Sequence, residues 1–183
     1  MYELGRCAAW AAIHAGVKLG DVVAVNGVGF AGNILLQGAA KSGASKVIAI
    51  DVVPAKLRSH AALGAEHVID ARKVDPVEAV NEITKGEGRG RGHRGHRWNG
   101  IGIKQALGMV RHNGIISLYG DNYALVDSFC FHRFHEDGLE IRNSTPSTTP
   151  SCVPWKTCAK PTALWNGLRS RYRLPELCHL SAG

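Results

Sequence analysis

The sequence lacks the features that mark membrane, secreted and zinc-knuckle proteins. No continuous apolar run reaches the length of a membrane span, and the N-terminus has none of the charged, apolar and small-residue blocks of a signal peptide. We therefore expect a cytoplasmic protein. The five cysteines are odd in number and form no C-x-x-C pair, which argues against a disulfide framework or a recognisable zinc knuckle, so we interpret them as reduced thiols.

Net charge is also small over most of the chain, although the formal total is +7. The segment 88–99 carries four arginines and no acidic residue, and the segment 144–183 carries five basic residues against one acidic residue. The rest of the chain is nearly neutral. The basic character therefore belongs to two local segments and does not indicate a general affinity for nucleic acid or for an anionic membrane.

Short apolar runs alternate with segments of helical periodicity through residues 22–143. The predicted strands are 22–26, 46–51, 66–70, 114–120 and 139–143, and the predicted helices are 30–42, 54–63, 75–84 and 102–111. This alternation is typical of β-α-β crossovers and predicts an α/β fold, a doubly wound parallel sheet of Rossmann type. We assign residues 1–143 to this domain. Residues 144–183 hold five of the seven prolines without periodicity and are predicted to form an irregular tail.

The pattern breaks after Lys85, in the segment GEGRGRGHRGHRWNG. This segment has no apolar periodicity, so we expect that it cannot form a buried strand and that the fourth strand of the sheet is disrupted or absent. Runs of arginine and glycine also occur in RNA-binding segments, where guanidinium groups stack on bases. RNA binding through residues 88–99 is the less favoured alternative, because such segments usually repeat and contain more aromatic residues.

A glycine turn follows the first predicted strand and carries the main functional signal. Gly27-Val28-Gly29-Phe30-Ala31-Gly32 matches G-x-G-x-x-G between a strand and a helix, where the helix N-terminus can bind a pyrophosphate. Asp51 closes the second strand, at the position of the acid that binds adenosine ribose hydroxyls. Its charge would repel a 2′-phosphate, so NAD is favoured over NADP, although Lys56 and Arg58 lie near enough to weaken this preference.

Two other nucleotide-binding families fit the same residues poorly. S-adenosylmethionine methyltransferases usually carry an acid just before the glycine turn, where this chain has Ala24, Val25 and Asn26. Short-chain dehydrogenases carry a Tyr-x-x-x-Lys pair, and no tyrosine in this sequence has a lysine four positions later. Neither family is favoured by these residues.

From about Glu3 to Asn143 the chain resembles the cofactor domain of the zinc-type alcohol dehydrogenases, the medium-chain dehydrogenase/reductase family. The resemblance lies in HAGVKLGDVVAVNGVGFAG, in KLRSHAALGAEHVID, which corresponds to the family pattern KLxxAxxLGAxxVI, and in IKQALGMVRHNGIISLYG and DGLEIRN. It implies that Gly27–Gly32 contact the pyrophosphate and that Asp51 and Lys56 contact the adenine ribose. It also implies that the backbone near Tyr119 and Gly120 lies beside the nicotinamide.

The resemblance further implies a catalytic zinc, which the family holds mostly in an N-terminal domain of its own. We expect that domain to be missing, so we assign no catalytic residue and no metal ligand, and we expect zinc not to be bound by this chain. Glu3 aligns with an acidic zinc ligand of some members and Cys7 lies nearby, but a zinc site needs three protein ligands. We interpret both as ordinary helix residues.

The family usually has a strand similar to GADVVIEAVGG where this chain has GRGRGHRGHRWNG. Residues 88–95 can be encoded by codons that, read one base out of frame, give Gly-Ala-Asp-Val-Val-Ile-Glu-Ala. We therefore hypothesise a frameshift, in the gene or in its sequencing, that begins near Gly88 and is restored near Gly100. A second shift would account for the loss of family character after about Asn143.

The sequence thus predicts the dinucleotide-binding portion of a zinc-type alcohol or polyol dehydrogenase, which uses NAD for hydride transfer. The alternative is a non-catalytic dinucleotide-binding or interaction module. A small alcohol or carbonyl substrate is expected only with a catalytic domain, and a homodimer through the last strand is possible by resemblance. The pairs His93 and His96, and His132 and His135, have a spacing that could contact a metal, but we favour a solvated pair and a helix surface respectively.

Overall fold

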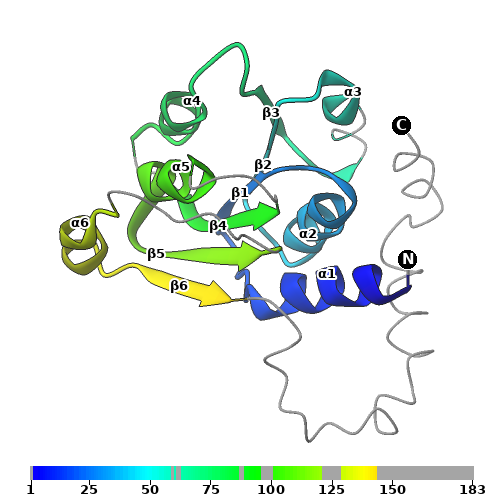
Figure 1. Ribbon diagram of the computed structural model, residues 1–183, viewed down its shortest axis with the longest axis horizontal. Coiled ribbons are helices and arrows are strands. Elements are labelled where there is room, and N and C mark those ends of the chain that lie inside the picture. The colour runs from blue at the N-terminus through cyan, green and yellow to red at the C-terminus, as the bar shows by residue number, and fades with distance from the viewer. Residues whose placement is uncertain are drawn as a thin grey trace, which may run out of the picture.

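The computed structural model describes residues 2–58, 60, 63–86, 89–95, 101–120 and 129–143, and only the backbone of residues 2–4, 6, 89–95, 101 and 143. These residues form one parallel sheet with helices on both faces (Figure 1). The strands are β1 Val22–Asn26, β2 Lys46–Asp51, β3 His67–Asp70, β4 Arg89–Gly95, β5 Val110–Tyr119 and β6 Glu140–Asn143. The helices are α1 Tyr2–His14, α2 Phe30–Lys41, α3 Pro54–Leu57, α4 Pro76–Ile83, α5 Ile101–Met109 and α6 Phe131–Glu136.

The strand order is β3-β2-β1-β4-β5-β6, and every pairing is parallel. This order is that of a doubly wound dinucleotide-binding sheet, in which the chain reverses direction across the sheet between β1 and β4. The predicted Rossmann fold is therefore confirmed. Because all strands run the same way, their carboxyl ends, including Asn26, Asp51 and Tyr119, lie along one edge of the sheet.

The core divides into layers on the two faces of the sheet. Val23 and Val25 of β1 pack with α1, α2 and Leu57 on one face. Ala24, between them, packs with Ile48, Ile50, Val80 of α4 and Met109 of α5 on the other face. A third cluster joins α5, β5 and the segment before β6. This alternation explains why β1 and β2 are apolar at nearly every position, as expected for strands buried on both faces.

Most predicted elements differ from the observed ones only at their ends. One exception is the helix predicted over 54–63, which ends at Leu57. The carbonyl of His60 accepts hydrogen bonds from the N–H groups of Leu63 and Ala65, so a separate turn follows the short helix. The strand predicted to begin at residue 114 begins at Val110, because Val110 pairs with Arg89 across an irregularity in the ladder.

The expectation of a missing fourth strand is wrong. Residues 89–95 form β4, which pairs with β1 on one side and with β5 on the other. A β-ladder is made by backbone N–H and C=O groups, which every residue except proline supplies, and this segment contains no proline. The absence of apolar periodicity bears on how firmly a strand is held and does not prevent its formation.

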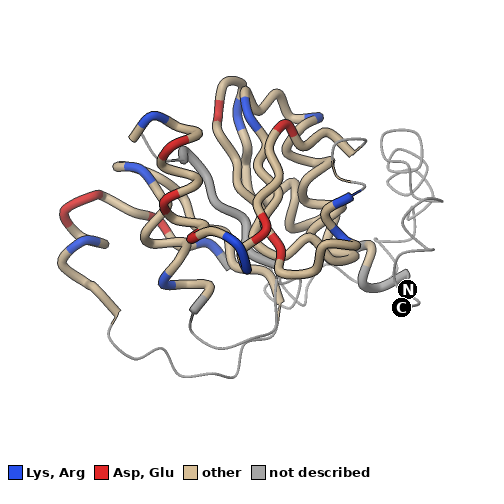
Figure 2. Tube along the Cα trace, turned by 90° about the horizontal axis from the view of Figure 1, so that it is seen from above, with Lys and Arg blue, Asp and Glu red and all other residues tan. Residues whose placement is uncertain are grey.

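The predicted tail, residues 144–183, lies outside the described residues. Within the described chain, no helix combines the length and apolar composition needed to cross a membrane. Outside β4, basic and acidic positions are interspersed along the described chain (Figure 2), in keeping with the near neutrality that the sequence predicts outside residues 88–99 and 144–183.

Candidate dinucleotide site

The glycine turn joins β1 to α2 and requires glycine at two positions, 27 and 32. Gly27 has a φ of 95°, in the left-handed region, and its N–H donates to the carbonyl of Ile50 at 2.8 Å. Gly32 packs directly against Gly27, since a Cβ atom at position 32 would be 2.0 Å from the Gly27 carbonyl oxygen. The turn is therefore pressed between β2 and the first turn of α2.

Gly29 has the opposite environment, because a Cβ atom there would have no atom within 4 Å. It is the N-cap of α2, and no side chain caps the helix and no acidic residue stands in its first turn. The first hydrogen bond of the helix runs from the N–H of Asn33 to the Gly29 carbonyl at 2.9 Å. The preceding N–H groups have no intrahelical acceptor and, with the helix dipole, make this end suitable for an anion.

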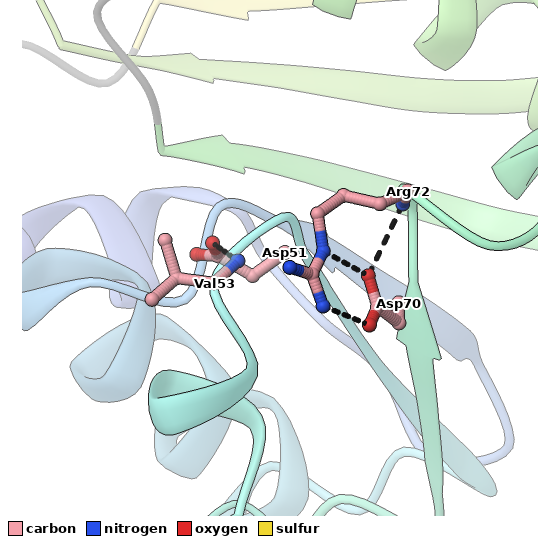
Figure 3. Close-up of polar contacts among 4 residues, drawn as sticks. All are labelled: Asp51, Val53, Asp70 and Arg72. Atoms are coloured by element: carbon pink, nitrogen blue, oxygen red, sulfur yellow. Dashed lines mark hydrogen bonds and ion pairs between the residues drawn. The ribbon is translucent and has the colours of Figure 1, made fainter.

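Asp51 is 3% exposed and ties the turn to the end of β2. Its Oδ2 accepts a hydrogen bond from the N–H of Val28 at 3.0 Å. Its Oδ1 accepts a hydrogen bond from the N–H of Val53 at 2.9 Å, which Figure 3 shows. A carboxylate offers about four acceptor positions, so each oxygen can accept one more hydrogen bond. The acid predicted to bind ribose hydroxyls thus also fixes the turn, a structural task that the sequence motif does not reveal.

A buried polar pair lies next to the turn and was not predicted. The Nε2 of His60 donates to Oδ1 of Asn33 at 2.6 Å, and both side chains are buried. The His60 Nδ1 has no hydrogen-bond partner among the described residues. Burial lowers the pKa of His60, and the nearby backbone of Leu57 and Val28 and the charge of Asp51 oppose this effect. The sequence did contain a signal for this pair, because position 60 holds a histidine where the family pattern KLxxAxxLGAxxVI has an alanine.

A second unpredicted feature lies where β3 ends beside β2. Asp70 is the register partner of Asp51. Its carboxylate accepts Nε of Arg72 at 3.0 Å, Nη2 at 2.7 Å and the Arg72 backbone N–H at 3.1 Å (Figure 3). The hydrogen bonds from Arg72 lower the pKa of Asp70 to about 2. This places a fixed guanidinium group at the same end of the sheet as Asp51.

The other predicted cofactor residues lie on the elements around the turn. Phe30 and Ala31 begin α2 and are partly buried against the core. Lys56 lies in α3, and its ammonium group has no ion-pair partner within the described part of the chain. Tyr119 ends β5 and packs partly buried against the cluster that includes α2, and Gly120 follows with a φ of 104°. Hydrogen bonds thus join the turn to Asp51, and Tyr119 and Gly120 lie at the same carboxyl edge of the sheet, with Tyr119 packed against the cluster that includes Val28 of the turn.

The described residues do not fit a zinc ion. They contain no group of three histidine, cysteine or acidic side chains that could hold a metal. His132 and His135 are exposed on α6, as predicted for a helix surface. Cys7 lies in α1, while the side chain of Glu3 and the side chains of His93 and His96 are outside the described residues. No chemical step through zinc is therefore derived for this chain.

A comparison with known protein families decides which family the chain belongs to. The family described as Zinc-binding dehydrogenase matches residues 31–153, which are 123 of the 183 residues. The chain belongs to this family. The matched range includes Asp51, Lys56, Tyr119 and Gly120 and every strand from β2 to β6, and it begins inside the glycine turn.

Individual relatives agree with this assignment. The alcohol dehydrogenase of Rhizobium meliloti is 36% identical over 104 residues, and the sorbitol dehydrogenase of Bacillus subtilis is 28% identical over 116 residues. The matches cover 57% and 59% of this chain but only 29% and 31% of those proteins. The solved alcohol dehydrogenase TADH from Thermus sp. ATN1 is 32% identical with a TM-score of 0.70, over 77% of this chain and 40% of its own. The matched part of the chain thus spans less than a third of the length of each of these two curated relatives.

Proposed function

We propose that the chain binds NAD and serves as the dinucleotide-binding portion of an alcohol or polyol dehydrogenase that transfers a hydride. The observation that carries this proposal is the contrast between Gly32 and Gly29. A side chain at position 32 would collide with the turn itself, whereas position 29 opens onto free space at the N-terminus of α2. The turn is closely packed at Gly32 and has no side chain at Gly29, so a pyrophosphate can approach its backbone closely.

Each residue group then has a distinct task. The free N–H groups at the start of α2 would bind the pyrophosphate oxygens, and Asp51, with Lys56 nearby, would bind the adenine ribose. Tyr119 and Gly120 would flank the nicotinamide at the carboxyl end of β5. When bound, NAD supplies the acceptor for the hydride. NADP is the less favoured cofactor, because the Asp51 carboxylate would repel its 2′-phosphate.

The chain's own role is cofactor binding, and none of its residues is given a catalytic task. Substrate activation in this family depends on zinc, and the part of the chain that the structure describes offers no three-ligand cluster for it. We propose that the catalytic zinc is held by a domain that this sequence does not include. Activity and substrate are therefore properties of the complete dehydrogenase.

The test is a calorimetric titration of the full chain with NAD, using wild type and Gly29→Ala. The new methyl group would enter open space, and a φ of −74° suits alanine, so the free energy of unfolding should change by less than about 0.5 kcal/mol. The same methyl group would hold a pyrophosphate away from the helix, so the Kd should rise about tenfold or more. Equal NAD affinity of the two proteins, or no binding by wild type, would refute the proposal.

Asp51→Asn provides the second variant of that titration. Asparagine keeps an acceptor for one of the N–H groups of Val28 and Val53, whereas alanine would leave both unpaired and would confuse loss of binding with loss of fold. We expect weaker NAD binding. Asp21→Asn is the matched control, because it removes the same charge just before the opposite end of β1, and it should leave the Kd unchanged.

A further inference from the structure

The ends of β2 and β3 bring an acid and a base to the adenosine end of the proposed site. Asp51 and Asp70 are register partners in the parallel pair, and the N–H of Ala71 donates to the Asp51 carbonyl at 3.0 Å. The chain after β3 is therefore held against the last residue of β2. Arg72 follows Ala71 directly, so its position relative to Asp51 is set by backbone hydrogen bonds of the sheet.

The Arg72 side chain is fixed along one edge and free along the other. Its Nε and Nη2 both bond to the Asp70 carboxylate, while Nη1 has no hydrogen bond to any described residue. The side chain is 50% exposed. In the view of Figure 3 the guanidinium group lies between Asp51 and Asp70. Arg72 forms no ion pair with Asp51, whose two oxygens accept backbone N–H groups instead.

A guanidinium group held in this way is suited to a phosphate oxyanion. Arginine forms strong, directional hydrogen bonds with phosphate, and an anchored side chain loses little freedom on binding. The ribose of a dinucleotide bound at Asp51 would present its 2′ position beside the ends of β2 and β3. A 2′-phosphate there would meet the repulsion of Asp51 and the attraction of the free Arg72 edge together.

We propose that Arg72 is the specificity-determining residue of this end of the site and that it admits the 2′-phosphate of NADP. This inference rests on the proposed dinucleotide function and deepens it. The chain then binds NADP as well as NAD, with NAD preferred, and Arg72 contributes to the affinity for NADP alone. Arg72 is not a catalytic residue, because it lies at the adenosine end and touches no reacting atom.

The test is calorimetric titration of wild type, Arg72→Gln and Lys73→Gln with NAD and with NADP. In Arg72→Gln the Kd for NADP should rise about tenfold, while the Kd for NAD should change less than about twofold. Lys73→Gln is the matched control, since Lys73 is the next residue, is exposed and has no ion-pair partner within the described residues. It should change neither Kd by more than about twofold. Arg72→Lys keeps the charge and should retain part of the NADP affinity.

Loss of Arg72 also frees the Asp70 carboxylate, whose charge could itself repel NADP. The double variant Arg72→Gln with Asp70→Asn removes both charges, and NADP binding should remain weak in it. Recovery of wild-type NADP affinity in the double variant would overturn the proposal, as would equal weakening of NAD and NADP in Arg72→Gln. Wild type that binds NAD but not NADP would overturn the role of Arg72 alone. Wild type that binds neither would overturn the proposed function as well.

Discussion

The two central strands of the sheet, β1 and β4, lie side by side and differ in almost every property except backbone geometry. Positions 23–26 of β1 pair with positions 91–94 of β4 in regular parallel register. The β1 sequence is VVAVN, and Val23, Ala24 and Val25 are fully buried. The β4 sequence is RGRGHRG, with three arginines, one histidine and three glycines.

The difference separates the two contributions that a strand makes to a sheet. Backbone hydrogen bonds give β4 its place between β1 and β5 whatever its side chains are. Apolar side chains supply most of the free energy of folding, and a central strand normally supplies them on both faces. β1 does both, whereas β4 has no apolar side chain to offer. The sheet is therefore expected to be least stable at β4.

The largest expected effect comes from giving β4 a sequence of the family type. Replacing residues 88–95 with GADVVIEA would place two valines and one isoleucine in the middle of the sheet, each contributing about 1.5–3 kcal/mol if buried. We expect the free energy of unfolding to rise by about 5 kcal/mol and the midpoint of thermal unfolding by about 10–20 °C. Thermal unfolding of both proteins, followed by circular dichroism, measures the midpoint and the free energy of unfolding.

The matched control places the same eight residues at 88–95 in scrambled order, so that the composition changes equally but the run of three consecutive apolar residues is broken. The scrambled chain should show a smaller gain. If the family sequence gave no gain over wild type, β4 would not be the weak strand, and the frameshift hypothesis would lose its structural support. If both sequences gave the same gain, removal of the arginines would be the cause, independent of strand packing.

A smaller effect, of opposite sign, is expected on the β1 side. Gly32→Ala puts a methyl group 2.0 Å from the Gly27 carbonyl oxygen, which is backbone and cannot move aside without shifting the turn. We expect unfolding to become easier by about 3 kcal/mol. Gly29→Ala, three residues earlier, is the control and should be nearly neutral. If Gly32→Ala had the same free energy of unfolding as wild type, the turn would be able to shift without cost. The contrast between a closely packed β1 side and a weakly packed β4 would then be weaker.

The elements around β1 could be predicted from the sequence because their residues satisfy several requirements at once. Val22–Asn26 is apolar, β-branched and followed by a glycine turn, so burial, strand preference and turn chemistry agree. The prediction for β4 relied on side chains alone and was wrong, because its strand is defined by backbone pairing with β1 and β5. The early end of α3 was also missed, since it follows from the His60 turn.

The candidate site was predictable in its position and less so in its partners. The spacing from Gly27 to Asp51 correctly placed turn and acid together, as the hydrogen bond from Val28 to Asp51 shows. Arg72 was missed, because its relation to Asp51 depends on the pairing of β2 with β3, which a single sequence does not display. The partner of His60, Asn33, is 27 positions away and no motif connects the two.

The smallest predicted effect uses His60 to test how strictly the β1 side excludes charge. Burial lowers the His60 pKa in the folded chain below its ordinary value of 6.5. As pH falls through 6.5 the unfolded chain gains this proton first, so the unfolded state is favoured. The contribution of neutral His60 to stability is therefore complete above pH 6.5 and decreases as pH falls below it. Urea unfolding at pH 7.5 and at pH 5.5 measures this loss.

His60→Ala has the residue of the family pattern at this position and should show a smaller loss of stability between the two pH values. His132→Ala is the control, because His132 is exposed on α6 and its loss should leave the pH dependence unchanged. If His60→Ala lost as much stability as wild type between pH 7.5 and pH 5.5, protonation of the buried His60 ring would not be the cause of the acid destabilisation. The buried region beside the glycine turn would then accommodate a charged side chain. The contrast between an apolar β1 side that excludes charge and a β4 that carries charged residues would not hold.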